Sequence, residues 1–68
     1  MSSLKIMVNG EPQTTQAETL EELCRALGYR DMKIATALNG DFVPEARRDA
    51  TPLSPEDRVE IVAPRQGG

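Results

Sequence analysis

Apolar and polar residues alternate at the start of the chain, over residues 4–9. The residues on the apolar side are Leu4, Ile6 and Val8. A period of two is typical of a strand with one buried face. Asn9-Gly10 follows directly and predicts a hairpin, because a type I′ turn needs positive φ at both central residues. Residues 11–15 form the predicted return strand, which Pro12 places at a sheet edge because proline has no N–H to donate.

A helical period replaces the alternation in the next segment. Apolar residues recur at spacings of three and four, namely at Leu20, Leu23, Cys24 and Leu27. This spacing predicts an amphipathic helix of about two and a half turns, packed on a sheet through its three leucines. Thr19 and Glu22 fit a capping box, in which each side chain binds a free backbone N–H at the helix start. Gly28 supplies a left-handed C-cap.

Two further strands are predicted around a second Asn-Gly turn. The third strand runs from Lys33 or Ile34 to Asn39, and the turn at Asn39-Gly40 leads into a fourth strand over residues 41–44. Charge and proline then interrupt the pattern as far as Asp57. We interpret this segment as a surface connection pinned by Leu53.

The last strand completes an α+β pattern. It spans residues 58–63, with Val59, Ile61 and Ala63 on one side. The order strand, strand, helix, strand, strand predicts two layers, a mixed sheet with one helix packed on one face. The first and last strands are expected to pair in parallel at the centre, through the long crossover that contains the helix. Residues 1–64 form the predicted domain, and residues 65–68 a flexible C-terminal tail.

Composition limits the chemistry that 68 residues can carry. A chain of this length has room for one core and little interior for a preformed pocket, which argues against a self-sufficient enzyme. There is no His, no Trp and one Cys, so zinc sites and disulfide frameworks are excluded. A net charge of −3 disfavours nucleic-acid binding. The start has no apolar run for a signal peptide or membrane span, and the lone cysteine favours the cytoplasm.

The sequence ends Arg65-Gln66-Gly67-Gly68. Two glycines are poor fold material because ordering them costs more conformational entropy than ordering any other pair. They suit a reactive arm, because a backbone without Cβ atoms can enter a narrow channel. The α-carboxylate at Gly68 is ionised at neutral pH and must be activated before it accepts a nucleophile. No glycine-rich phosphate loop is present, so the activating enzyme must be another protein and this chain its substrate.

These features together carry a family resemblance along nearly the whole chain. The matching pieces are Met7-Val8-Asn9-Gly10-Glu11, Thr19-Leu20-Glu21-Glu22-Leu23, Ala37-Leu38-Asn39-Gly40-Asp41-Phe42-Val43-Pro44, Leu53, Asp57-Arg58-Val59-Glu60-Ile61-Val62 and the terminal Gly-Gly. The sequence resembles the ThiS family of sulfur carriers in thiamine biosynthesis, which are β-grasp proteins like ubiquitin. It departs from the family pattern at Arg48, where many members have an aromatic residue, and at Glu56, where they have Gly. Both departures are expected in a surface loop.

The resemblance implies a role for each residue of the tail. An E1-like enzyme (ThiF) would use ATP to adenylate Gly68, and sulfur from a persulfide would replace AMP to give a thiocarboxylate. Thiazole synthase (ThiG) would then take that sulfur. Gly67 would provide clearance, and Gln66 and Arg65 would be tail contacts. The carrier would hold no cofactor and catalyse nothing.

Residues outside the tail include one thiol and a candidate surface for partners. Cys24 lies on the apolar stripe without an adjacent His, so we interpret it as a core residue. Val62 points away from the side of Val59 and Ile61, and by parity shares the outer face with alanines of the neighbouring strand. The predicted partner docking patch is Val62, Ala37, Ala35, Phe42 and Pro44. The acidic residues Glu56, Asp57 and Glu60 are interpreted as a solvated face.

Three alternatives stay open at the level of sequence. One is a small subunit of molybdopterin synthase, which has the same chemistry in another pathway and matches this short chain less well. Another is a ubiquitin-like modifier, in which Gly68 would form an isopeptide with a lysine and carry no sulfur. The third is an interaction module with an inert tail.

Overall fold

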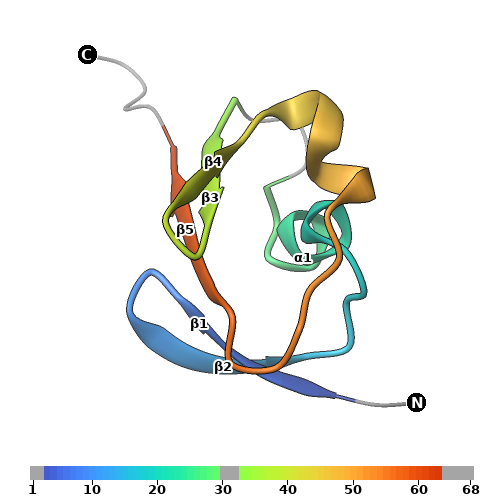
Figure 1. Ribbon diagram of the computed structural model, residues 1–68, viewed down its shortest axis with the longest axis vertical. Helices are drawn as coiled ribbons and strands as arrows, with labels where there is room; N and C mark the ends of the chain where they lie inside the picture. The colour runs from blue at the N-terminus through green and yellow to red at the C-terminus, as the bar shows by residue number, and fades with distance from the viewer. Residues whose placement is uncertain (1–2, 30–32, 64–68) are drawn as a thin grey trace.

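A mixed sheet with the strand order β2-β1-β5-β3-β4 forms one layer of the fold (Figure 1). The computed structural model describes residues 3–29 and 33–63. The strands are β1 (Leu4–Val8), β2 (Glu11–Thr15), β3 (Ala35–Leu38), β4 (Asp41–Val43) and β5 (Arg58–Val62). β1 and β5 pair in parallel at the centre, and the other neighbours pair antiparallel. The predicted α+β class and mixed sheet are confirmed.

The two Asn-Gly turns have the backbone conformation that the sequence predicts. Asn9 and Gly10 have φ of 51° and 84°, and Asn39 and Gly40 have φ of 52° and 90°. Positive φ at both central residues is the type I′ geometry, whose twist matches that of the flanking strands. β2 is an edge strand, as Pro12 indicates. β3 begins one or two residues later than expected, at Ala35.

The helix α1 (Leu20–Ala26) is capped at both ends. The Thr19 hydroxyl accepts from the Glu22 N–H at 3.2 Å, as the capping-box pattern predicts. The Glu22 carboxylate, however, accepts from the N–H of Glu18 at 2.8 Å, one residue before the N-cap. At the other end Gly28 has a φ of 93° and its N–H bonds to the carbonyl of Arg25. A left-handed glycine bonded in this way ends the helix.

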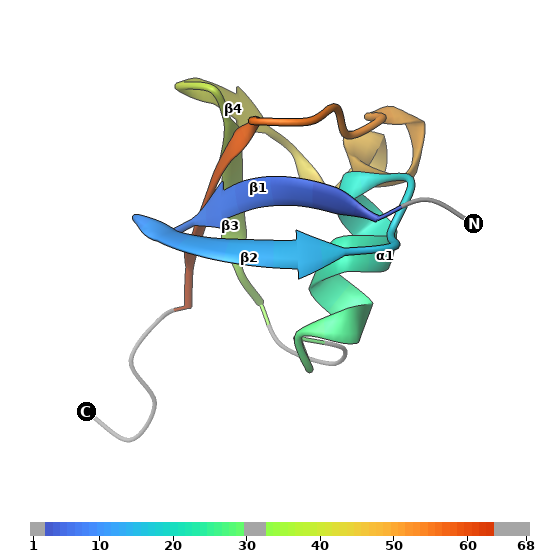
Figure 2. The same cartoon turned by 90° about the horizontal axis from the view of Figure 1, so that it is seen from below.

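One apolar cluster joins the helix to the sheet, and Figure 2 shows α1 against one side of the strands. The cluster is formed by buried residues of the helix, the strands and the long connection: Ile6, Val8, Leu20, Leu23, Cys24, Val43, Leu53, Val59 and Ile61. Leu27 is only partly buried at the edge of this cluster. The predicted helix face is therefore correct, with Leu20 and Leu23 as its centre.

The connection between β4 and β5 is more ordered than a surface loop. It contains the 3₁₀ helix η1 (Glu45–Ala50), and Leu53 is buried as predicted. Arg48 is only 7% exposed, so the expectation that it lies in a surface loop is wrong. Its Nε donates to Thr36 Oγ1 at 3.1 Å and its guanidinium donates to the Ile34 carbonyl at 2.7 Å. These two neutral acceptors take two of the five guanidinium N–H groups, and no buried side-chain nitrogen or oxygen atom among the described residues is left without a partner.

Among the described residues, one non-glycine residue other than the turn asparagines has a left-handed backbone. It is Glu56, which is exposed just before β5 and has a φ of 72°. The left-handed region is where glycine costs least, so the Cβ of Glu56 makes this backbone conformation less favourable than it would be for glycine. Within residues 3–29 and 33–63, no helix is both long and apolar enough to cross a membrane.

Candidate functional site

The face of β3, β4 and β5 that points away from α1 exposes large apolar side chains. Phe42 is 69% exposed and Val62 is 64% exposed. Both alternate with buried neighbours, since Val43 and Ile61 point inward to the cluster under α1. Strand alternation therefore forces Phe42 and Val62 outward once Val43 and Ile61 are buried.

Strand register brings the predicted docking residues into two adjacent pairs. Ala35 lies opposite Val62, and Ala37 lies opposite Phe42. Side chains directly opposite each other are about 5 Å apart at Cβ, which makes each pair a contact. Pro44 and Phe42 line a shallow hollow together with Arg47. We call Val62, Ala35, Ala37, Phe42 and Pro44 the outer patch.

The tail residues of the predicted site lie outside the described part of the chain. They are Gly68, Gly67, Gln66 and Arg65. The structure describes the root of the tail, where β5 ends at Val62 and Ala63 follows it, exposed. Val62 belongs to the outer patch, so the patch reaches the end of the strand that leads into the tail.

Both Asn-Gly turns hold β5 through asparagine side chains, which sequence reasoning missed. Asn9 Oδ1 accepts from the Ile61 N–H at 2.8 Å, and Asn9 Nδ2 donates to the Ile61 carbonyl at 3.1 Å. Asn39 Oδ1 accepts from the Arg58 N–H at 2.9 Å. The sequence does contain a signal for these bonds, namely asparagine as the first central residue of each turn. The positive φ of that position is by itself a sufficient reason for asparagine, so the contact with β5 was not predicted.

Cys24 is a core residue, as predicted. Its side chain belongs to the apolar cluster and its residue is only 3% exposed. Burial raises the pKa of the thiol above its ordinary value of 9.0, while the nearby Arg48 charge lowers it in part and Glu21 adds to the rise. The thiol is therefore protonated near neutral pH, and a thiol is a far weaker nucleophile than a thiolate.

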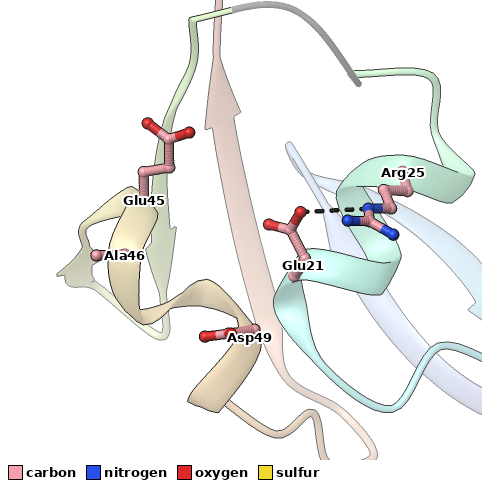
Figure 3. Close-up of a pocket in the computed structure, with 5 residues that line it drawn as sticks. All are labelled: Glu21, Arg25, Glu45, Ala46 and Asp49. Carbon is pink, nitrogen blue, oxygen red and sulfur yellow. Dashed lines mark hydrogen bonds and ion pairs between the residues drawn. The ribbon is translucent and has the colours of Figure 1, made fainter.

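A hollow between α1 and η1 is lined mainly by charged side chains (Figure 3). It is lined by Glu21, Arg25, Glu45, Ala46 and Asp49. Arg25 Nε pairs with Glu21 Oε2 at 3.3 Å across one helical turn, and the other two carboxylates lie apart from this pair (Figure 3). Among the described residues there is no group of three or more side chains arranged to hold a metal ion. The hollow offers a solvated acidic surface.

Comparisons with known proteins agree on one family. The sequence model of the ThiS family matches residues 5–68. The sulfur carrier protein ThiS of Thermus thermophilus is 33% identical over 63 residues, which cover 93% of this chain and 98% of that protein. A thiazole synthase of Magnetococcus marinus is 37% identical over 60 residues. These cover 87% of this chain but only 18% of the thiazole synthase.

A solved structure carries the same likeness into three dimensions. The crystal structure of the thiamine biosynthesis protein ThiS from Geobacter metallireducens superposes with a TM-score of 0.78 at 32% identity. The match covers 96% of this chain and 100% of that one, which confirms the predicted β-grasp fold. The family match spans both hairpins, the helix, the outer patch and the terminal glycines, and the chain therefore belongs to the ThiS family.

Proposed function

We propose that this chain carries sulfur as a thiocarboxylate on Gly68 and supplies it for thiazole formation. Membership of the ThiS family makes the chain a sulfur carrier protein of thiamine biosynthesis, and so a protein co-substrate and not an enzyme. The observation that carries the finer proposal is that the family match continues to residue 68 and so includes Gly67 and Gly68. The proposal takes residues 65–68 as a flexible arm on a β-grasp domain of residues 1–64.

The chemistry starts from an ionised and unreactive carboxylate. In the first step a Gly68 oxygen attacks the α-phosphorus of ATP on an E1-like enzyme, and pyrophosphate leaves. In the second step the terminal sulfur of a persulfide attacks the carbonyl carbon, and AMP leaves. A thiol then cleaves the S–S bond of the resulting acyl disulfide, which frees the thiocarboxylate and leaves a disulfide on the donor side. The carrier contributes the carboxyl group, and its partners supply ATP, sulfur and thiol.

The outer patch is the proposed docking surface for these partners. Phe42 and Val62 are large, apolar and exposed, and burial of such side chains supplies most of the energy of a small interface. Val62 also lies at the end of the strand that leads into the tail, so a partner on this face is close to the tail root. Arg65, Gln66 and Gly67 would then lie along the channel of the partner enzyme.

Thiazole synthase is the proposed acceptor of the sulfur. Its support is that one thiazole synthase contains, in 18% of its length, a segment 37% identical to this chain. Two activities carried on one chain often belong to consecutive steps.

The cytoplasm is the proposed compartment, because thiols persist in reducing compartments.

The test loads and unloads the carrier in separate stages. The purified chain, whose intact mass first establishes that it ends at Gly68, is incubated with an E1-like enzyme, ATP and a persulfide donor with thiol. The proposal predicts a mass gain equal to the difference between sulfur and oxygen, located on the C-terminal peptide. Adding thiazole synthase with its substrates should return the mass to that of the carboxylate. Covalent conjugates to lysines without any mass gain would contradict the proposal and favour a modifier.

A further inference from the structure

The asparagine of the first hairpin acts on β5 in a way that its turn does not require. Its backbone N–H bonds to the Val59 carbonyl at 2.9 Å, and its side chain then bonds to both the N–H and the carbonyl of Ile61. The side-chain amide of Asn9 thus makes the two hydrogen bonds to β5 that the backbone of a further β1 residue would otherwise make. Ile61 lies 52 residues further along the chain, so this is a tertiary contact and not part of the turn.

The contact matters because β1 stops pairing early. The parallel register covers Met7 with Arg58 and Val8 with Val59, after which the chain turns at Asn9-Gly10. Without the Asn9 amide, β5 would be held on this side only as far as Val59. With it, the hold extends two residues further, to Ile61. On its other side β5 is paired with β3 as far as Val62.

We propose that Asn9 is a positioning residue for the tail, fixing the point and direction from which the reactive arm leaves the domain. This inference rests on the proposed function, since it concerns delivery of Gly68 to the activating enzyme. Pairing with β3 already holds one side of β5 as far as Val62, and the Asn9 bonds hold the other side at Ile61, one residue before the strand ends. A strand end held on both sides keeps a more constant direction than one held on a single side. An arm that leaves in a fixed direction samples fewer positions of its carboxyl group around the docked domain.

The second hairpin offers a matched control. Asn39 has the same positive φ, precedes a glycine in the same way, and makes two side-chain hydrogen bonds. Those bonds go to the Arg58 N–H and to Asp57 Oδ1 at 3.0 Å, at the start of β5. Each asparagine therefore makes two side-chain hydrogen bonds, Asn39 to Arg58 at the entry of β5 and to Asp57 just before it, and Asn9 to Ile61 near the exit towards the tail.

Three variants separate positioning from general stability. Asn9→Gly and Asn39→Gly each keep a residue that accepts positive φ and each remove two side-chain hydrogen bonds. Asn9→Asp also tolerates that φ and keeps the acceptor for the Ile61 N–H, but it has no N–H to donate to the Ile61 carbonyl. Its second carboxylate oxygen would face the Ile61 carbonyl, acceptor against acceptor, so the variant restores only the bond from the Ile61 N–H.

Two readouts are needed, one of structure and one of delivery. Amide hydrogen exchange should show protection lost by at least about tenfold at Ile61 in Asn9→Gly and at Arg58 in Asn39→Gly, because each amide loses its acceptor. Steady-state adenylation with an E1-like enzyme should show a kcat at least about threefold lower in Asn9→Gly, since misplacement by about 1 Å can cost up to roughly 100-fold. Its KM should stay within about twofold, because the outer patch is intact. Asn9→Asp should lie between Asn9→Gly and wild type, and Asn39→Gly should keep the wild-type kcat.

Each contrary result has a definite meaning. Unchanged protection at Ile61 in Asn9→Gly overturns the contact, and lost protection with unchanged kcat overturns its positioning role. An equal fall of kcat in Asn39→Gly overturns it too, because the effect would then follow general loss of bracing. If wild type is not adenylated at Gly68 at all, the proposed function fails and this inference fails with it. If wild type is adenylated and the Asn9 variants have the same kcat as wild type, only the positioning role fails and the proposed function stands.

Discussion

The two faces of β3, β4 and β5 carry apolar residues on the same strands but in opposite environments. On the inner face Val43, Val59 and Ile61 are buried with α1, whereas on the outer face Phe42 and Val62 are mostly in solvent. The inner residues are explained by folding, because their burial is what stabilises a domain this small. The outer residues gain little from folding because they stay mostly in solvent, which supports the proposal that they serve in binding.

The largest expected effect lies at the centre of the inner face. Leu23→Ala should lower the free energy of unfolding by about 2 to 5 kcal/mol, because it leaves a cavity beneath the helix. Urea denaturation measures this loss. Leu23→Met, which nearly conserves volume, is the control and should cost less than about 1.5 kcal/mol. An unchanged midpoint in Leu23→Ala would mean that the inner face is not the core.

The next largest effect is expected at Arg48, a buried charged residue on the inner side of the sheet. Arg48→Met keeps an apolar stem but removes the donors to Ile34 and Thr36, so we expect unfolding to become easier by about 1 to 3 kcal/mol. The matched control is Arg47→Met on the exposed side of the same 3₁₀ helix, with an effect within about 0.5 kcal/mol. Equal effects of the two substitutions in thermal denaturation would show that burial of Arg48 contributes nothing specific.

These two substitutions also mark where sequence reasoning succeeds and where it stops. Alternation, the Asn-Gly turns and the leucine spacing are local signals, and they predicted the strands, both hairpins and the inner helix face. Burial of Arg48 could not be predicted in this way, because its acceptors lie 12 and 14 residues away in the chain. A charged residue in a segment rich in charge and proline favours solvent until the fold supplies those acceptors.

The candidate site was likewise predictable from the sequence only in part. Parity along β5 placed Val62 outward, and the structure adds the register that sets Ala35 opposite Val62 and Ala37 opposite Phe42. The bonds from Asn9 to Ile61 join residues 52 apart, which no local pattern encodes. The shift of β3 to a start at Ala35 has a similar origin, because strand ends are set by the partner strand and not by the apolar run itself.

On the outer face we expect a substitution to weaken binding to a partner more than it lowers the stability of the fold. Phe42→Ala should change the free energy of unfolding by no more than about 0.5 kcal/mol, because the ring is mostly in solvent. It should raise KM for an E1-like enzyme about tenfold, which corresponds to about 1.4 kcal/mol of binding. Thr14→Ala, exposed on β2 at the far edge of the sheet, is the control for both measurements. A large loss of stability with unchanged KM would invert the comparison of the two faces.

The smallest effect concerns a residue that belongs to neither face. Glu56→Gly should raise the free energy of unfolding by about 1 kcal/mol, because a residue with a Cβ pays for its left-handed φ of 72°. Differential scanning calorimetry would measure it as a higher melting temperature. Glu45→Gly, in the first turn of η1 without positive φ, is the control and should lower stability. A destabilised Glu56→Gly would mean that the side chain makes a compensating contact.

The central claim is that sulfur is carried on the carboxyl group of Gly68 and not on the thiol of Cys24. The most direct measurement is the intact mass of three proteins after loading with an E1-like enzyme, ATP and a persulfide donor with thiol: wild type, a chain lacking Gly68, and Cys24→Ala. The account predicts a gain equal to the difference between sulfur and oxygen in wild type and Cys24→Ala, and none without Gly68, because the buried thiol is protonated and enclosed. A gain that survives loss of Gly68 and disappears in Cys24→Ala would contradict it.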